Sequence, residues 1–204
     1  MHMNTKKNSM IATCLTAILV FRPVASFAQA NTFSGQATVL RASALGISLA
    51  LADTGALPAS GGNRSTSLAS VNVAGLASAD TLSSSTSGGG SSSQSQSSLL
   101  HLSLVGGLVA ADLVKSNSSA TCSGGTAAVA GTAQIVGLVV AGQSVVVSNP
   151  NLAISLPGGI SVIVNEQTSS PSGSSGSTTV NALHVKGPSI DVVVASAHSD
   201  ITCS

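Results

Sequence analysis

Four runs of β-branched and aliphatic residues near the end of the chain decide its fold class. They read TAQIVGLVVAGQSVVV at 132–147, ISVIVNEQ at 160–167, TTVNALHV at 178–185 and DVVVASAHSDITC at 191–203. Short apolar runs of this kind, closed by glycine, proline or asparagine turn signals, are typical of strands. The last third of the chain therefore predicts a β-sheet.

The preceding part of the chain carries a weaker version of the same pattern. Gly75-Leu76 and Ala79-Asp80 recur about 32 residues later as Gly107-Leu108 and Ala111-Asp112. A degenerate repeat of strand pairs accounts for this spacing. Chance similarity in a chain rich in alanine, glycine and leucine is the alternative.

These patterns predict a single all-β domain over residues 31–204. Turn signals at hairpin spacing favour a mostly antiparallel sandwich or roll of about eight to ten strands, and the repeat leaves a β-solenoid as the alternative. The run 99–114 could be helical, but the central Gly106-Gly107 disfavours a helix by about 1 kcal/mol per glycine. The serine- and glycine-rich segments 83–98 and 168–178 lack the apolar side chains that offset ordering entropy, so we expect flexible loops there.

The first 30 residues have the layout of a secretory signal peptide. Lys6 and Lys7 precede an apolar stretch from Met10 to Phe21, and Ala28-Gln29-Ala30 supplies small residues for cleavage after Ala30. A transmembrane anchor is the alternative, but about 20 apolar residues are needed to cross a bilayer. We therefore expect an exported protein without a transmembrane segment in its mature chain.

Two cysteines remain once the signal peptide is removed, Cys122 and Cys203. In an exported protein a pair of cysteines favours one disulfide. It would close a loop of about 80 residues and stabilise the fold by roughly 4 kcal/mol on the chain-entropy model. Two unpaired buried thiols are the alternative.

The charge of the chain argues against a nucleic-acid partner. Charged residues make up 6% of the sequence, compared with roughly 25% in an average soluble domain. After residue 30 there are four basic and six acidic residues, a net charge of −2. No basic stripe is present to contact phosphates.

No pattern typical of an enzyme stands out. A nucleophile needs a base and a group that orients the base, but the chain has no Gly-x-Ser-x-Gly elbow, and Gly173-Ser174-Ser175-Gly176 falls in a predicted loop. A glycosidase would need paired carboxylates and aromatic rings, and only Phe33 remains after residue 30. We interpret Glu166 as a polar strand end. The sequence thus predicts a non-catalytic protein without a cofactor.

Metal binding is the strongest chemical alternative. His198 and Asp200 are two residues apart on a predicted strand, so their side chains share one face. His184 lies on the preceding strand and could stand opposite them. A His/His/Asp set can hold zinc or another divalent ion. A solvated outer face is the competing interpretation of the same three residues.

Most of residues 34–203 resembles the choice-of-anchor P family of bacterial exported proteins, specifically from residue 123 onward and only in composition before it. The resemblance is carried by the motifs LPGG at 156–159, NEQ at 165–167, VNALHV at 180–185 and VVASAHSD at 193–200. It implies a secreted or surface protein without an assigned activity. The family's name reflects varied C-terminal sorting tails, whereas this sequence stops at Ser204 without a sorting motif, so we expect release rather than anchoring.

The sequence leads to two functional hypotheses. The first is a non-catalytic periplasmic, cell-surface or extracellular β-domain. It would act in adhesion, matrix or envelope structure through serine- and threonine-rich surfaces, with envelope or matrix components as partners. The second is a module that binds a small ligand or metal ion around His184, His198 and Asp200.

Overall fold

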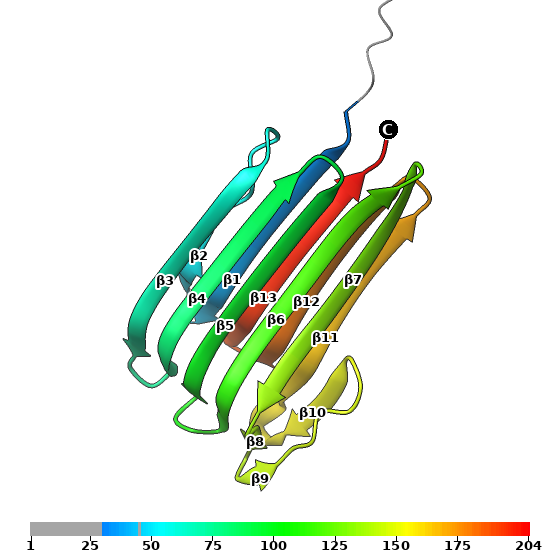
Figure 1. Cartoon of the computed structure of the whole chain (residues 1–204). Coiled ribbons are helices and arrows are strands. Elements are labelled where there is room, and N and C mark those ends of the chain that lie inside the picture. The colour runs from blue at the N-terminus through cyan, green and yellow to red at the C-terminus, as the bar shows by residue number, and fades with distance from the viewer. Residues whose placement is uncertain (1–29, 45) are drawn as a thin grey trace, which may run out of the picture.

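The computed structural model describes residues 30–44 and 46–204, which form two antiparallel sheets stacked face to face (Figure 1). The predicted all-β sandwich is confirmed, and its hairpin connections rule out the solenoid alternative. No helix in the described part of the chain is long and apolar enough to cross a membrane. The predicted signal peptide lies almost entirely in residues 1–29, outside the described residues.

The two sheets have different strand orders. Sheet A runs β10-β11-β12-β13-β1-β2, and sheet B runs β3-β4-β5-β6-β8-β9 with β7 also paired to β6. The elements are β1 (Thr32–Ala44), β2 (Ile47–Asp53), β3 (Gly62–Val73), β4 (Ala77–Gly89), β5 (Ser92–Leu104), β6 (Val109–Ser123), β7 (Thr126–Val136), β8 (Val139–Val140), β9 (Gln143–Ser144), β10 (Leu152–Leu156), the 3-10 turn η1 (Pro157–Gly159), β11 (Ile160–Ser172), β12 (Ser175–Gly187) and β13 (Ile190–Thr202).

The two predicted loops are strands, and this part of the sequence prediction was wrong. Segment 83–98 forms the facing halves of β4 and β5, and segment 168–178 forms those of β11 and β12. The prediction assumed that only apolar side chains offset ordering entropy. In the structure the ladder bonds do so together with inward-facing hydroxyls that find partners. The run 99–114, by contrast, consists of strands joined at Gly106-Gly107, as expected.

A row of left-handed residues crosses sheet A. Ala52, Ala195 and Asn165, on alternate strands, have φ angles of 47°, 50° and 53°. Val39 on β1 and Ala182 on β12 lie at the same level on the strands between them. On every strand the residues just before and just after this level are paired with those of the neighbouring strand. Left-handed φ is rare for residues other than glycine; here it interrupts the ladder on neighbouring strands without adding a residue to any of them, since the register is the same on both sides. We call this line the bulge row.

Sheet B has its own bulge row. Thr81 on β4 and His101 on β5 have φ angles of 47° and 50°, and the β4–β5 register shifts on both sides of Asp80. The Ala-Asp repeat noted in the sequence falls here, since Asp80 precedes Thr81 and Asp112 lies opposite His101. The repeat therefore marks where strands of sheet B reach the bulge.

The bulge rows reverse which residues face inward. On β13, Val192 and Val194 are buried before the bulge, whereas Ala197, Ser199 and Ile201 are buried after it. The same change of phase occurs in β1, β4, β5, β6 and β12. Because a one-residue shift moves every following side chain to the other face, the interior has two distinct halves.

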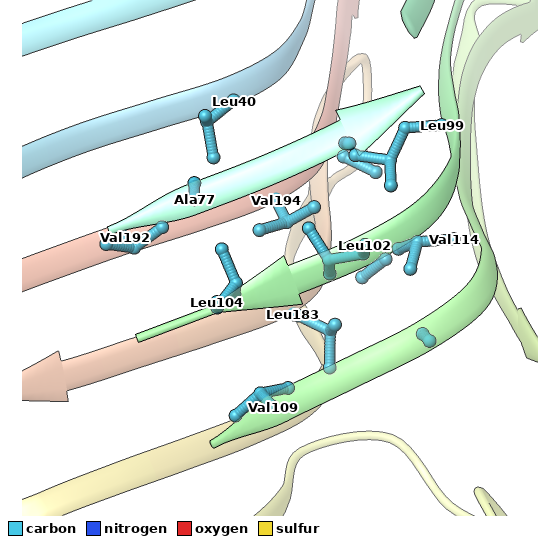
Figure 2. Close-up of a cluster of buried hydrophobic side chains, with 14 of the residues drawn as sticks. Leu40, Ala77, Leu99, Leu102, Leu104, Val109, Val114, Leu183, Val192 and Val194 are labelled. Atoms are coloured by element: carbon cyan, nitrogen blue, oxygen red, sulfur yellow. The ribbon is translucent and has the colours of Figure 1, made fainter. Parts of the chain in front are cut away.

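One half is an aliphatic core at the end of the sandwich that carries the β5–β6 and β12–β13 turns (Figure 2). Leucines and valines from both sheets fill it. Each fully buried side chain of this size contributes roughly 1.5–3 kcal/mol. The largest are Leu40, Leu82, Leu99, Leu104, Leu183, Val109, Val114, Val162 and Val164.

The other half of the interior is built from hydroxyls. Ser95 Oγ donates to the carbonyl of His198 across the sandwich at 2.7 Å, and Ser97 Oγ donates to the carbonyl of Ser196 at 3.1 Å. The sheets approach closely there, since a Cβ on Gly35 would lie 2.5 Å from the Thr86 hydroxyl. The buried members of this hydroxyl layer are Ser84, Thr86, Ser93, Ser95, Ser97, Ser116, Ser118, Thr178 and Ser199.

A disulfide closes the hydroxyl end of the sandwich. Cys122 near the end of β6 and Cys203 just after β13 have sulfurs 2.12 Å apart, so the predicted pair is formed. A small apolar cluster of Ala120, Ala127 and Ile201 surrounds it. The bond links sheet B to sheet A across 81 residues of chain.

Removing one hydroxyl from the layer should cost measurable stability. Ser97 is fully buried and also shares a 2.9 Å hydrogen bond with Ser116, so Ser97→Ala leaves two buried groups short of a partner. We expect the free energy of unfolding to fall by about 1–3 kcal/mol in urea denaturation. Ser98→Ala, at the neighbouring outward-facing position, is the control, and equal losses in both variants would contradict a hydroxyl layer.

Removing the disulfide should have a larger effect. Cys122→Ala/Cys203→Ala frees a loop of 81 residues in the unfolded chain, and we expect a loss of roughly 4 kcal/mol. Reduction of the wild-type protein during the same denaturation series should give a similar loss. An unchanged unfolding midpoint after reduction would show that the bond does not constrain the unfolded chain.

Candidate functional site

The outer faces of the two sheets differ in charge. Sheet A carries most of the ionisable side chains, whereas the outer face of sheet B between the bulge row and the disulfide carries mainly hydroxyls and amides, with Lys115 among them. The ionisable residues of sheet A are Arg41, Asp53, Glu166, His184, Lys186, Asp191, His198 and Asp200. Both faces are therefore candidates for function, for different chemical reasons.

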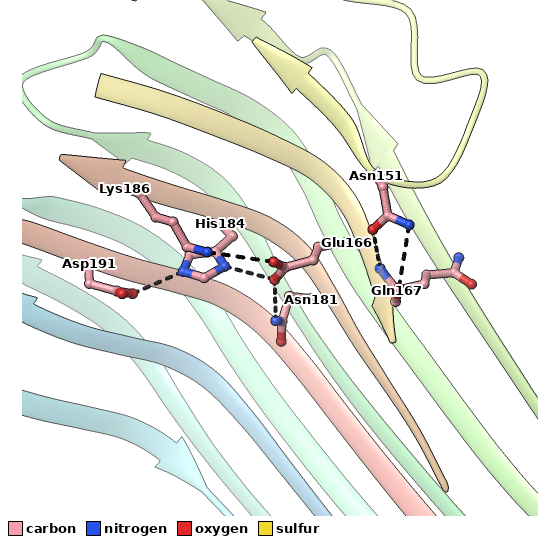
Figure 3. A network of polar contacts seen from close by, with 7 residues as sticks. All are labelled: Asn151, Glu166, Gln167, Asn181, His184, Lys186 and Asp191. Atoms are coloured by element: carbon pink, nitrogen blue, oxygen red, sulfur yellow. Dashed lines mark hydrogen bonds and ion pairs between the residues drawn. The ribbon is translucent and has the colours of Figure 1, made fainter. Parts of the chain in front are cut away.

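A compact network centres on His184 on β12 (Figure 3). Its Nδ1 lies 2.7 Å from Glu166 Oε2, and its Nε2 lies 3.0 Å from Asp191 Oδ1. Asn181 donates to the same Glu166 oxygen at 2.6 Å, and Lys186 Nζ is 3.9 Å from the other. The imidazole is 10% exposed, whereas the side chains of Lys186 and Asp191 are 46% and 57% exposed, so the centre of the network is shielded and its ends reach solvent.

The network sets the ionisation of Glu166. Burial alone raises the pKa of its carboxyl, but hydrogen bonds from Asn181 and His184, with the positive charges of His184 and Lys186, outweigh burial. The pKa of Glu166 is therefore lowered from its ordinary value of 4.5. The carboxylate form is the one that the network holds.

A second polar group lies farther along β13. His198 Nδ1 is 2.8 Å from the Thr179 hydroxyl, and His198 Nε2 is 3.1 Å from Asp200 Oδ2. Hydroxyl, imidazole and carboxylate thus stand in the order used by nucleophilic triads. The group lies on regular paired strands whose backbone N–H groups serve the ladder, so donors to an oxyanion would have to be side chains; Gln36 and Arg41 line the same hollow.

The metal set predicted from the sequence is not brought together. His184 lies opposite Val193, whereas His198 lies opposite Thr179, which places the two histidines about 17 Å apart along the strands at ~3.4 Å per residue. The prediction that His184 could stand opposite His198 was therefore wrong by five residues of register. In the described residues no group of three or more His, Cys, Asp or Glu side chains is placed to hold a metal ion.

The outer face of sheet B presents a regular polar array. One transverse row follows the ladder through Ser65, Ser85, Gln96, Asn117 and Thr132, one residue from each of β3 to β7. Neighbouring strands are about 4.8 Å apart, so the row spans the sheet at regular intervals. None of its side chains is charged.

A parallel row lies two residues away along each strand. It runs through Asn63, Ser87, Gln94, Ser119 and Ala130. Between the two rows is a shallow groove of about 360 Å³. We call this region the neutral groove; its outward-facing lining residues are Ser85, Ser87, Gln94, Gln96, Asn117, Ser119, Ala130 and Thr132.

Sequence reasoning missed the neutral groove because it assigned its centre to a loop. A usable signal was nevertheless present in Ser93-Gln94-Ser95-Gln96-Ser97, where the serine positions are buried and the glutamine positions are exposed. Strict alternation of a small and a larger polar residue has the period of a strand. The signal is missed when that period is sought only in apolar residues.

Comparisons of the chain with protein-family models, with curated proteins and with solved structures found no match. The functional argument therefore depends on the site geometry.

The Glu166 network predicts a pH effect on stability. Since the folded-state pKa of Glu166 is lowered, its contribution is present above about pH 4.5 and is lost as the pH falls through the folded-state pKa. Glu166→Gln should be less stable than wild type at pH 7, and the difference should shrink below about pH 4.5. Thermal unfolding between about pH 3 and 7 measures it, with the more exposed Asp80→Asn as control. A difference that is constant with pH would contradict this assignment.

Proposed function

We propose that the protein is a non-catalytic binding domain of the cell surface or extracellular space. It adheres to a neutral, hydroxyl-rich polymer of the envelope or matrix through the neutral groove. The observation that carries this proposal is the uncharged, laterally registered array of serine, threonine, glutamine and asparagine side chains on sheet B.

The chemistry of these side chains favours polysaccharide hydroxyls. Serine and threonine hydroxyls and the amides of Gln94, Gln96 and Asn117 can each donate and accept hydrogen bonds, as a sugar hydroxyl does. The absence of charge from the groove lining removes attraction to phosphate or sulfate groups. A flat array suits an extended chain better than a small molecule, which is usually enclosed by a concave pocket.

The expected affinity per sugar is low. The groove lining contains no aromatic ring, so sugar stacking does not contribute. Binding to a long polymer, in which many equivalent sites are linked, compensates for weak individual contacts. Export through the predicted signal peptide and the resemblance to the choice-of-anchor P family belong to the same proposal, because both would bring the protein to where such polymers occur.

Co-sedimentation with insoluble neutral polysaccharides tests the proposal. Gln94→Ala/Gln96→Ala/Asn117→Ala removes three amides from the groove, and we expect about a tenfold or greater loss of binding, from roughly 0.5–1.5 kcal/mol per hydrogen bond. Binding of the wild type should persist in about 1 M salt, because no ion pair is involved.

The matched control is Gln36→Ala/Thr179→Ala on the outer face of sheet A, which should bind as wild type does. Retention of binding in the triple variant, or binding restricted to acidic or basic polymers, would contradict the proposal.

A further inference from the structure

The edges of the two sheets are protected to different degrees. Pro150 and Pro157 flank β10 and Pro171 lies within β11, so proline marks one edge of sheet A, and Pro58 lies five residues after the end of β2 at the other. Strand β7, an edge of sheet B, contains neither proline nor a charged residue. Proline and charge are the usual means of preventing an edge strand from pairing with another chain.

The backbone of β7 presents unpaired groups along this edge. The N–H of Ala127 donates to the carbonyl of Gly173 at 2.9 Å, outside the ladder with β6. In an antiparallel strand alternate residues direct both backbone groups to the same side, so Val129, Gly131, Ala133 and Ile135 face the open edge too. In the described residues β7 pairs with no strand other than β6.

We propose that two copies of this chain associate through β7, forming an antiparallel strand pair centred on Gly131. This register places Val129 opposite Ala133 of the second copy and places Gly131 opposite itself. All these residues direct their backbone N–H and C=O groups to the open edge. The two Gly131 residues at the centre of the interface can therefore exchange both backbone hydrogen bonds. Because β7 is uncharged, no like charges oppose each other.

The same register joins the outer faces of the two copies. Ala130 lies opposite Thr132 of the second copy, and both positions are exposed and line the neutral groove. The polar rows of one sheet B thus continue into the other, giving one surface with two grooves. The strand pair itself does not depend on what the grooves bind. A single-strand interface is small, so the association is weak in solution.

Two double variants at the same positions test the pairing. Ala130→Lys/Thr132→Lys sets lysine against lysine across the pair twice, and we expect dimerisation to weaken about tenfold or more. Ala130→Lys/Thr132→Glu sets lysine against glutamate twice and should dimerise at least as well as wild type. Both variants change only exposed positions, so a general folding defect would affect both alike.

Sedimentation velocity from about 10 µM to about 1 mM protein gives the association constants. A wild type that remains monomeric over this range would overturn the proposal. Growth beyond the dimer would also overturn it, since β7 would then pair with a different edge, such as β3 of the next copy. Equal behaviour of the two double variants would show that association uses another surface. Sedimentation of Gln94→Ala/Gln96→Ala/Asn117→Ala, which leaves β7 unchanged, distinguishes the two proposals: this variant should lose polysaccharide binding and still dimerise as wild type does.

Discussion

The structure depends on hydroxyls that cross from one sheet to the other. Ser95 and Ser97 on β5 donate to carbonyls of β13, and Ser118 shares a 2.9 Å hydrogen bond with Ser199. A buried hydroxyl without a partner costs about 1–3 kcal/mol, so each of these bonds removes a penalty as well as adding an attraction. Hydrogen bonds are directional, and this layer therefore fixes the relative position of the sheets more narrowly than aliphatic contacts alone would.

The bulge rows make this division of the interior possible. In a strand that alternated without interruption, every second residue would face inward along the whole strand, in phase with the residues of the aliphatic core. The left-handed residues at Ala52, Ala195 and Asn165 shift that set by one, so the inward positions of the second half coincide with serine, threonine and small residues. Because the shift occurs at the same level in neighbouring strands, their ladders stay in register on both sides. Each left-handed residue costs of order 1–3 kcal/mol. The packing of the two sheets against each other holds these residues in place and offsets that cost.

The sequence allowed the fold class and the cysteine pair to be predicted, because both depend on local signals. The Val- and Ile-rich runs after residue 132 have strand character whatever surrounds them, and Cys122 and Cys203 are the only cysteines after Cys14. The roles of Ser93 to Ser97 could not be predicted in the same way. A serine gains from burial only when a particular carbonyl or hydroxyl stands opposite, and that partner lies about 100 residues away in the chain. The register of His184 is set instead by the tight turn between Gly187 and Ile190, which pairs His184 with Val193 along a ladder without register shifts; the prediction did not use this turn.

The low charge of the chain has a structural consequence. With few ion pairs available to enforce pairing, strand register must come from steric fit and directional hydrogen bonds. Six of the ten charged side chains after residue 30 lie on sheet A, where the Glu166, His184 and Asp191 cluster links three strands and prolines flank β10. On sheet B the lining of the neutral groove and the edge strand β7 carry no charge. In a protein selected only to remain monomeric, such an edge would be a liability, so its position beside the groove favours a surface that works as a repeated unit.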